Sequence, residues 1–223
     1  MRERPILFSG PMVRAILAGR KTQTRRLVKA PHAADAWIFD GALGLWESGI
    51  EADYGRLGHG EYVRCPYGVP GDRLWVRETW YCDVPHDDPD RDEHLYYRAD
   101  GEARDQFEQL DPPNIRLWKP SIHMPRWASR LTLDVTGVRV ERLQDISEED
   151  ARGEGVTPFA HDPEGDCWTA QPPERKHRAA FEYLWGEING WQGEPRARAP
   201  WASNPWVWVV EFTGAPRERW WAR

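Results

Sequence analysis

The residues with the clearest chemical potential lie in the stretch AGRKTQTRR, residues 18–26. Lys21 and Thr24 stand three positions apart there, so in an extended or turning segment an amine and a hydroxyl can converge on one point. A hydroxyl is a weak nucleophile until a neighbouring base activates it. Free lysine titrates at about 10.4, and nearby cations lower that pKa. Three such cations flank the pair and are also expected to bind the substrate, namely Arg20, Arg25 and Arg26. The stretch predicts either a Lys21 base with a Thr24 nucleophile, or a solvated basic turn.

Four further residues could contact an anion or a base. Glu78, in VRETW, ends a predicted strand and could pair with Arg77 or with a cation of an active site. The segment SIHMPRWASR places His123, Arg126 and Trp127 after a proline loop. An arginine can hold a phosphate while a tryptophan stacks on a base. We therefore expect these side chains either to bind a substrate or to stabilise the fold.

The sequence gives no reason to expect a metal or another cofactor. The cysteines and the histidines outside the proline loop do not follow the tight spacing of a zinc site; the set considered is Cys65, Cys82, Cys167, His59, His86 and His161. The acidic run HDDPDRDEH, residues 86–94, lacks the glycine and the terminal glutamate of a calcium-binding EF-hand loop.

The overall charge limits the possible partners. The chain of 223 residues has 30 Lys and Arg against 36 Asp and Glu, which gives a net charge of −6. This balance weakly repels polyphosphate, so any nucleic-acid contact must be a local patch. A polymer would also meet the acidic loops, and this favours a nucleoside or small RNA-derived substrate over long RNA.

Cysteine usage and hydropathy indicate a cytoplasmic protein. Three cysteines without a CxxC pair do not make a disulfide framework. The N-terminus MRERPILFSGPM lacks the apolar run of a signal peptide. No stretch approaches the roughly 18–20 apolar residues that cross a membrane, so no membrane partner is expected.

Hydrophobic periodicity and turn signals predict the elements that would position these residues. We expect strands at 5–10, 73–80, 131–143 and 206–212, and helices at 9–19, 146–155 and 175–190. Ser147 should cap the second helix, and Thr136–Gly137 should form a bulge or turn in the long strand. The remaining segments are rich in Gly, Pro and Asp, and we interpret them as insertions at about 30–66, 83–118 and 157–174 of one domain spanning 1–223.

Several of these segments together resemble the ASCH domain of the PUA-like superfamily. They are GRKTQTRR, GDRLWVRE, the predicted helix ISEEDARGEG and the last strand WVWVVEF. The tryptophan-rich length, with KPSIHMPRWASR, is similar to ASCH proteins of phages and prophages. The resemblance covers roughly 5–29, 70–80, 119–156 and 175–212. It implies an α+β fold with a PUA-like small mixed β-barrel, flanking helices and long loop insertions.

The resemblance also implies an activity. One bacterial branch of the family hydrolyses N(4)-acetylcytidine to cytidine and acetate with a lysine base, a threonine nucleophile and a glutamate proton donor. Matched by motif, these fall on Lys21, Thr24 and Glu154, with Glu148 and Glu149 as nearby alternatives for the acid. Other branches are proposed RNA-binding modules or ribonucleases, so both remain alternatives.

Overall fold

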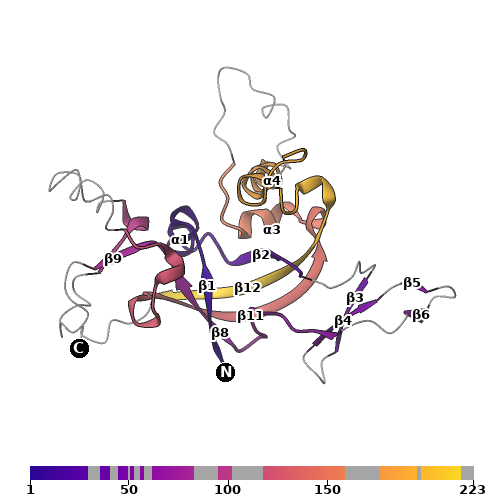
Figure 1. The fold of residues 1–223 in the computed structure, drawn as a ribbon, viewed down its shortest axis with the longest axis horizontal. Coiled ribbons are helices and arrows are strands. Elements are labelled where there is room, and N and C mark those ends of the chain that lie inside the picture. The colour runs from indigo at the N-terminus through magenta and orange to yellow at the C-terminus, as the bar shows by residue number, and fades with distance from the viewer. Residues whose placement is uncertain are drawn as a thin grey trace, which may run out of the picture.

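The computed structural model describes residues 1–29, 36–40, 45–49, 51–52, 56–57, 62–82, 95–101, 118–158, 176–194 and 197–216. Its centre is a five-stranded sheet in the order β1-β8-β11-β12-β2 (Figure 1). These strands are β1 (Glu3–Leu7), β8 (Arg73–Arg77), β11 (Leu131–Arg142), β12 (Trp206–Pro216) and β2 (Gln23–Leu27). β1 pairs with β8 in parallel, and the other neighbours are antiparallel, so the sheet is mixed.

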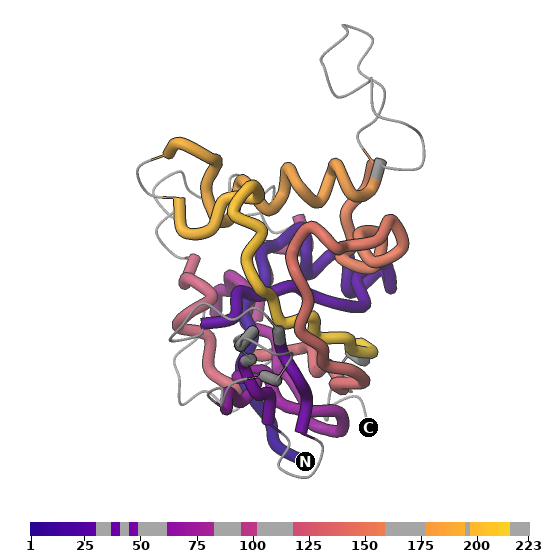
Figure 2. Tube along the Cα trace, turned by 90° about the vertical axis from the view of Figure 1, so that its right-hand side faces the viewer, coloured from indigo at the N-terminus to yellow at the C-terminus, as the bar shows by residue number. Residues whose placement is uncertain are grey.

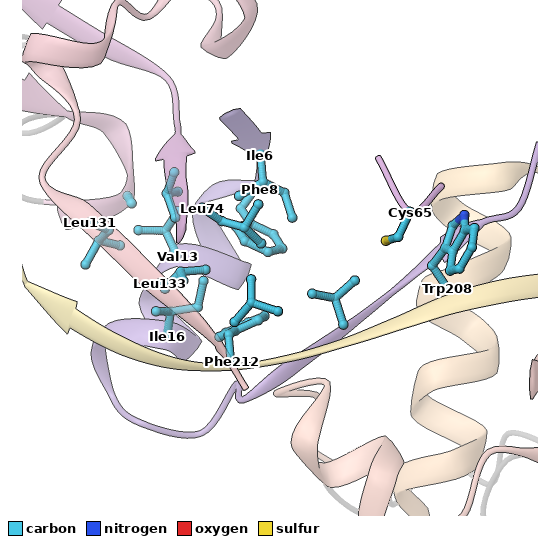
Figure 3. Close-up of a cluster of buried hydrophobic side chains, with 14 of the residues drawn as sticks. Ile6, Phe8, Val13, Ile16, Cys65, Leu74, Leu131, Leu133, Trp208 and Phe212 are labelled. Carbon is cyan, nitrogen blue, oxygen red and sulfur yellow. The ribbon is translucent and has the colours of Figure 1, made fainter. Parts of the chain in front are cut away.

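Helix α1 (Gly10–Leu17) connects the two edge strands of this sheet. A proline in its first turn suits a helix start, and Gly19 follows its end with a φ of 69°. The helix buries Val13 and Ile16 in the main core. Figure 3 shows both side chains beside Phe8 and Phe212, which come from the chain after β1 and from β12. The helix predicted at 9–19 is therefore confirmed, and it places residues 20–22 at an edge of the sheet.

Two further helices cover the face of β12 that points away from the main core. They are α3 (Glu148–Gly153) and α4 (Lys176–Asn189), and both lie above the curved strands in Figure 1. Val207 and Val209 pack with Phe181 and Trp185 of α4, whereas Trp208 packs in the main core. This alternation is that of a strand buried on both faces. The side view in Figure 2 places α4 at one end of the molecule and the N-terminus towards the other.

Local signals account for the start of α3 and the irregularity of β11. The Ser147 hydroxyl accepts a hydrogen bond from the Asp150 N–H at 3.0 Å, as expected for an N-cap. The pairing of β11 with β12 shifts between Val135 and Gly137, where a bulge or turn was predicted. Both predictions are confirmed, and so is the helix predicted at 175–190.

The insertion expected at 30–66 contains strands that the sequence did not predict. The strands β3 (Ala36–Asp40), β4 (Leu45–Gly49) and β7 (Tyr62–Val63) form a second sheet, and β5 (Glu51–Ala52) pairs with β6 (Arg56–Leu57). The rings of Trp37 and Trp46 lie 6.2 and 5.8 Å from the ring of Trp208. The insertion is therefore anchored on β12 by aromatic packing.

The other predicted insertions lie largely outside the described residues. From 83–118 the structure describes β10 (Leu95–Tyr97), which pairs with β9 (Trp80–Cys82), and from 157–174 it describes only the first two residues. Short 3-10 helices complete the described fold: η2 (Arg98–Asp100), η4 (Ser121–His123), η5 (Arg126–Ala128), η6 (Leu143–Asp145) and η9 (Trp201–Ser203). Among the described residues no helix is long and apolar enough to span a membrane.

The α+β class is confirmed, but the described strands do not close into a barrel. β1 and β2 are the edges of the open sheet, and no backbone ladder joins them in the described part of the chain. A side chain spans the gap instead, since Arg26 Nη2 of β2 donates to the Leu7 carbonyl of β1 at 2.6 Å. The sheet is therefore curved enough for its edges to approach each other without pairing.

Candidate functional site

Lys21 and Glu154, separated by 133 positions in sequence, form the centre of the site. Lys21 Nζ donates to Glu154 Oε2 and to the Glu154 carbonyl oxygen, both at 2.8 Å. The Lys21 side chain is 0% exposed and that of Glu154 is 3% exposed. The two backbones also form an isolated antiparallel bridge. The structure thus brings two of the three predicted catalytic residues into direct contact.

Local backbone geometry explains how the two chains approach so closely. Glu154 is the C-cap residue that follows α3, and the next residue, Gly155, has a φ of +80°. A Cβ at Gly155 would lie 2.7 Å from Lys21 Cβ and 2.9 Å from Ala15 Cβ. Glycine is therefore needed both for the left-handed conformation and for the space. The Thr22 N–H, which donates to the Gly153 carbonyl at 2.8 Å, holds the neighbouring backbone in place.

The electrostatic surroundings make Lys21 a candidate base. Burial is the largest influence and lowers the pKa of Lys21 below its ordinary value, because water no longer stabilises the charge. The Glu154 carboxylate opposes this, and the Arg26 and Arg25 guanidinium groups lower the pKa further. The sequence predicted a desolvated Lys21 whose pKa is lowered by Arg20, Arg25 and Arg26; in the structure burial has the largest effect, and Arg26 and Arg25 are the arginines that contribute. Arg20 is exposed and donates to the Gly155 carbonyl at 3.3 Å.

Arg25 is enclosed in ion pairs on the face that α3 covers. Its side chain is 0% exposed, and its nitrogens contact three carboxylates. Nη1 lies 3.1 Å from Glu154 Oε1, Nη2 lies 3.2 Å from Asp150 Oδ2, and Nε donates to Glu141 Oε1 at 3.0 Å. Arg25 was predicted to bind substrate, but each of its nitrogens already has a carboxylate partner within the protein.

Thr24 is buried on the other face of β2. It stands opposite Val210 of β12, as Arg26 stands opposite Trp208, and directly opposed residues share a face of the sheet. Thr24 and Arg26 therefore face the main core, away from Arg25. Lys21 Nζ and Arg26 Cζ lie 5.6 and 5.3 Å from the Phe8 ring centroid on this side.

Lys21 thus lies at the edge of the sheet, between the face of β2 that carries Thr24 and the face that α3 and Glu154 cover. Its ammonium is hydrogen-bonded to Glu154, and no hydrogen bond of the Thr24 hydroxyl is found within the described ranges. Catalytic hydrogen bonds are often absent before substrate binds. The arrangement provides a base and a hydroxyl three positions apart at one edge of the sheet, with an acid bonded to the base.

Glu78 belongs to a second buried cluster. It is 2% exposed and accepts two hydrogen bonds from Arg130, at 2.9 and 3.0 Å. Arg130 also contacts Asp100 at 2.8 Å and lies 4.0 Å from the Tyr97 ring centroid. Burial raises the pKa of Glu78, and Arg130 opposes that increase. The partner is therefore neither Arg77 nor Lys21, and the contacts of Glu78 favour a structural role.

The residues of the proline loop contact other parts of the fold. His123 is exposed, and Arg126 Nε donates to Glu3 Oε2 at 2.9 Å. The Trp127 ring packs edge-on against Trp80, with centroids 5.6 Å apart. None of the contacts found in the described part of the chain joins these three residues to Lys21, Thr24 or Glu154.

The described residues contain no cluster of side chains that could hold a metal. Cys65 is buried, and burial raises the pKa of its thiol to about 11. Four other residues that were considered for a zinc site, Cys167, His59, His86 and His161, lie outside the described residues, and so does the acidic run 86–94.

The chain matches no protein-family model, no curated protein and no solved structure in the comparisons made. The resemblance to the ASCH domain therefore stays a prediction from the motifs.

Proposed function

We propose that this protein hydrolyses the acyl amide of N(4)-acetylcytidine or of a related N-acylated nucleoside. Lys21 acts as the base, Thr24 as the nucleophile and Glu154 as the acid. The observation that supports this most is the buried contact of 2.8 Å between Lys21 and Glu154, in surroundings that lower the pKa of the lysine. Thr24 follows Lys21 by three positions in the chain. Buried titratable groups with a shifted pKa are common at functional sites.

Proton transfer along the hydrogen bond between Lys21 and Glu154 would supply the two groups that the reaction needs, a neutral amine and a protonated carboxyl. If the proton on Lys21 Nζ moves to Glu154 Oε2, the pair becomes a neutral amine and a protonated carboxyl without a change in net charge. The amine can then remove the proton of the Thr24 hydroxyl, and the carboxyl can protonate a leaving group. Burial favours the neutral amine of Lys21, because it penalises the charged form.

The chemistry follows the usual course of acyl transfer. The Thr24 oxygen attacks the carbonyl carbon of the acyl group while Lys21 takes its proton. The C–N bond of the tetrahedral intermediate breaks, the nitrogen receives a proton from Glu154, and cytidine leaves. Water then attacks the threonine ester, which releases the carboxylic acid and restores the hydroxyl. One water molecule is consumed for each amide cleaved.

The motifs support a PUA-like ASCH domain as the finer description of the fold. The approach of the edge strands through Arg26 and Leu7 is compatible with a curved sheet of this kind. The phage or prophage origin of such a long form rests on the motifs alone.

The exposure of the arginines bears on the alternative of RNA binding. An RNA-binding or ribonuclease site requires accessible cations along a groove. Arg25 is enclosed by carboxylates, and Arg26 contacts the Leu7 carbonyl, so two of the three predicted cations are engaged within the protein. This favours the small substrate.

Incubation of the purified protein with N(4)-acetylcytidine tests the proposal, with chromatography to measure cytidine and acetate. RNA binding and RNA cleavage are measured in the same buffers at several salt concentrations. We expect cytidine release that changes little with moderate salt. RNA affinity that falls steeply with salt, without cytidine release, would contradict the proposal and favour the binding module. RNA cleavage without cytidine release would favour the ribonuclease.

A further inference from the structure

Arg25 occupies an unusual position for an arginine on an edge strand. Its side chain is 0% exposed, and it lies between Glu154 at the end of α3, Asp150 within α3 and Glu141 of β11. A buried guanidinium without partners would be strongly destabilising, so its carboxylate contacts are required for the fold. This requirement for ion pairs does not explain why one of the three partners is Glu154, the carboxylate that also bonds Lys21.

Glu154 is held from two sides by two different cations. Its Oε1 lies 3.1 Å from Arg25 Nη1, and its Oε2 lies 2.8 Å from Lys21 Nζ. The first contact therefore fixes the plane of the carboxylate, and this directs the second oxygen at the lysine. A planar guanidinium is suited to such orientation, because its nitrogens are held in a rigid fork.

Arg25 itself is oriented by the rest of the fold. Glu141 of β11 accepts from its Nε at 3.0 Å, and Asp150 lies 3.2 Å from its Nη2. The Gln23 amide, on the same face of β2, donates to the Asp150 carbonyl at 2.7 Å. The position of the guanidinium is thus determined by β2, β11 and α3 together.

We propose that Arg25 is a positioning residue of the Lys21–Glu154 site: it orients Glu154 toward Lys21, although it does not contact the substrate itself. This inference rests on the proposed function for its kinetic test. It replaces the substrate-binding role that the sequence suggested for Arg25. It also explains why an arginine on β2 points away from the Thr24 face.

The charge of Arg25 should also affect the pKa of Lys21. The charged groups that act on Lys21 are Glu154 of the α3 end, which raises its pKa, and Arg25 and Arg26 of β2, which lower it. Loss of the Arg25 charge removes one of the lowering influences. This raises the pKa of Lys21, so the pH at which the base becomes neutral should increase.

Arg139 provides a matched control. It contacts two of the same carboxylates, Glu141 at 3.0 Å and Asp150 at 3.1 Å, and it also contacts Glu211. No contact between Arg139 and Glu154 is found within the described part of the chain. Arg139→Gln therefore removes the same charge and comparable ion pairs without releasing the carboxylate that faces Lys21.

The experiment compares Arg25→Gln, Arg139→Gln, Glu154→Gln and the double variant Arg25→Gln/Glu154→Gln in cytidine release from N(4)-acetylcytidine. We expect Arg25→Gln to lower kcat by ~10²-fold with KM nearly unchanged, because misplacement by about 1 Å has such effects. The alkaline-rising limb of its pH profile should move to higher pH. Arg139→Gln should stay within about threefold of the wild type, and the double variant should be no slower than Glu154→Gln, because residues acting as a unit are not additive.

Equal kcat values and pH profiles for Arg25→Gln and Arg139→Gln would overturn the inference, and so would fully additive losses in the double variant. If Arg25→Gln does not fold, Arg25→Lys replaces it: it keeps the charge but loses the fork, so kcat should fall in a protein that still folds. Full activity of a folded Arg25→Lys protein would also overturn the inference.

A readout without substrate separates this inference from the proposed function. In protein labelled at lysine Cε, an NMR titration should show Lys21 deprotonating at higher pH in Arg25→Gln than in Arg139→Gln. An unchanged Lys21 titration would contradict the inference. Absence of cytidine release from the wild type would contradict the proposed function alone.

Discussion

Substitution of Gly155 tests the packing that brings Glu154 to Lys21. In Gly155→Ala, the new Cβ would meet Lys21 Cβ at 2.7 Å and Ala15 Cβ at 2.9 Å, at a φ of +80°. The left-handed conformation costs an alanine about 1–2 kcal/mol, and overpacking adds about 1–3 kcal/mol. We therefore expect Gly155→Ala to lose about 2–5 kcal/mol of unfolding free energy, the sum of these two effects.

The chain offers a control that separates the two contributions. Gly19 has a similar φ of +69°, but a Cβ there would have nothing within 4 Å. Gly19→Ala should therefore lose only the conformational part, about 1–2 kcal/mol. Urea unfolding followed by tryptophan fluorescence measures both variants, with thermal melts as a second probe. If Gly155→Ala and Gly19→Ala were equally destabilised, the close approach of Lys21 to the α3 end would be refuted.

Two other predictions concern buried groups away from the proposed site. Burial raises the pKa of Glu78 in the folded protein, so Glu78 contributes stability that is complete below its unfolded pKa of about 4.3 and is lost as pH rises through the folded value. The unfolding free energy of the wild type, measured against Glu78→Gln by urea titration, should therefore decline from pH 4 upward, and a rising difference would contradict the assignment. Because burial raises the pKa of Cys65 to about 11, alkylation of that thiol at pH 8 should require unfolding, whereas rapid modification in native protein, seen by peptide mass spectrometry, would show that it is accessible.

Elements defined by short-range signals could be predicted from the sequence. The helix α1 has a proline in its first turn and a glycine after its end, and α3 has Ser147 as its cap. The irregularity of β11 next to Gly137 was likewise visible as a break in a β-branched pattern. Each of these depends on neighbours within a few residues, so one sequence suffices to recognise it.

Elements defined by distant partners could not be predicted. β2 reads QTRRL, a polar stretch that becomes a buried strand only because β12 pairs with it and carboxylates from β11 and α3 surround Arg25. Glu78 and Arg130 stand 52 positions apart, and nothing in the local pattern marks them as partners. Glu154 was reached through a motif resemblance, and its contact with Lys21 is a property of the fold.

The most direct test of the proposed activity is cytidine release from N(4)-acetylcytidine by Thr24→Ala, compared with Thr22→Ala. Thr22 is exposed and Thr24 is buried. The two variants make the same chemical change two positions apart, but only Thr24 is the proposed nucleophile. The proposal predicts that Thr24→Ala abolishes release at an unchanged melting temperature, whereas Thr22→Ala retains the wild-type rate. Equal rates in the two folded variants would contradict the assignment of Thr24 as the nucleophile.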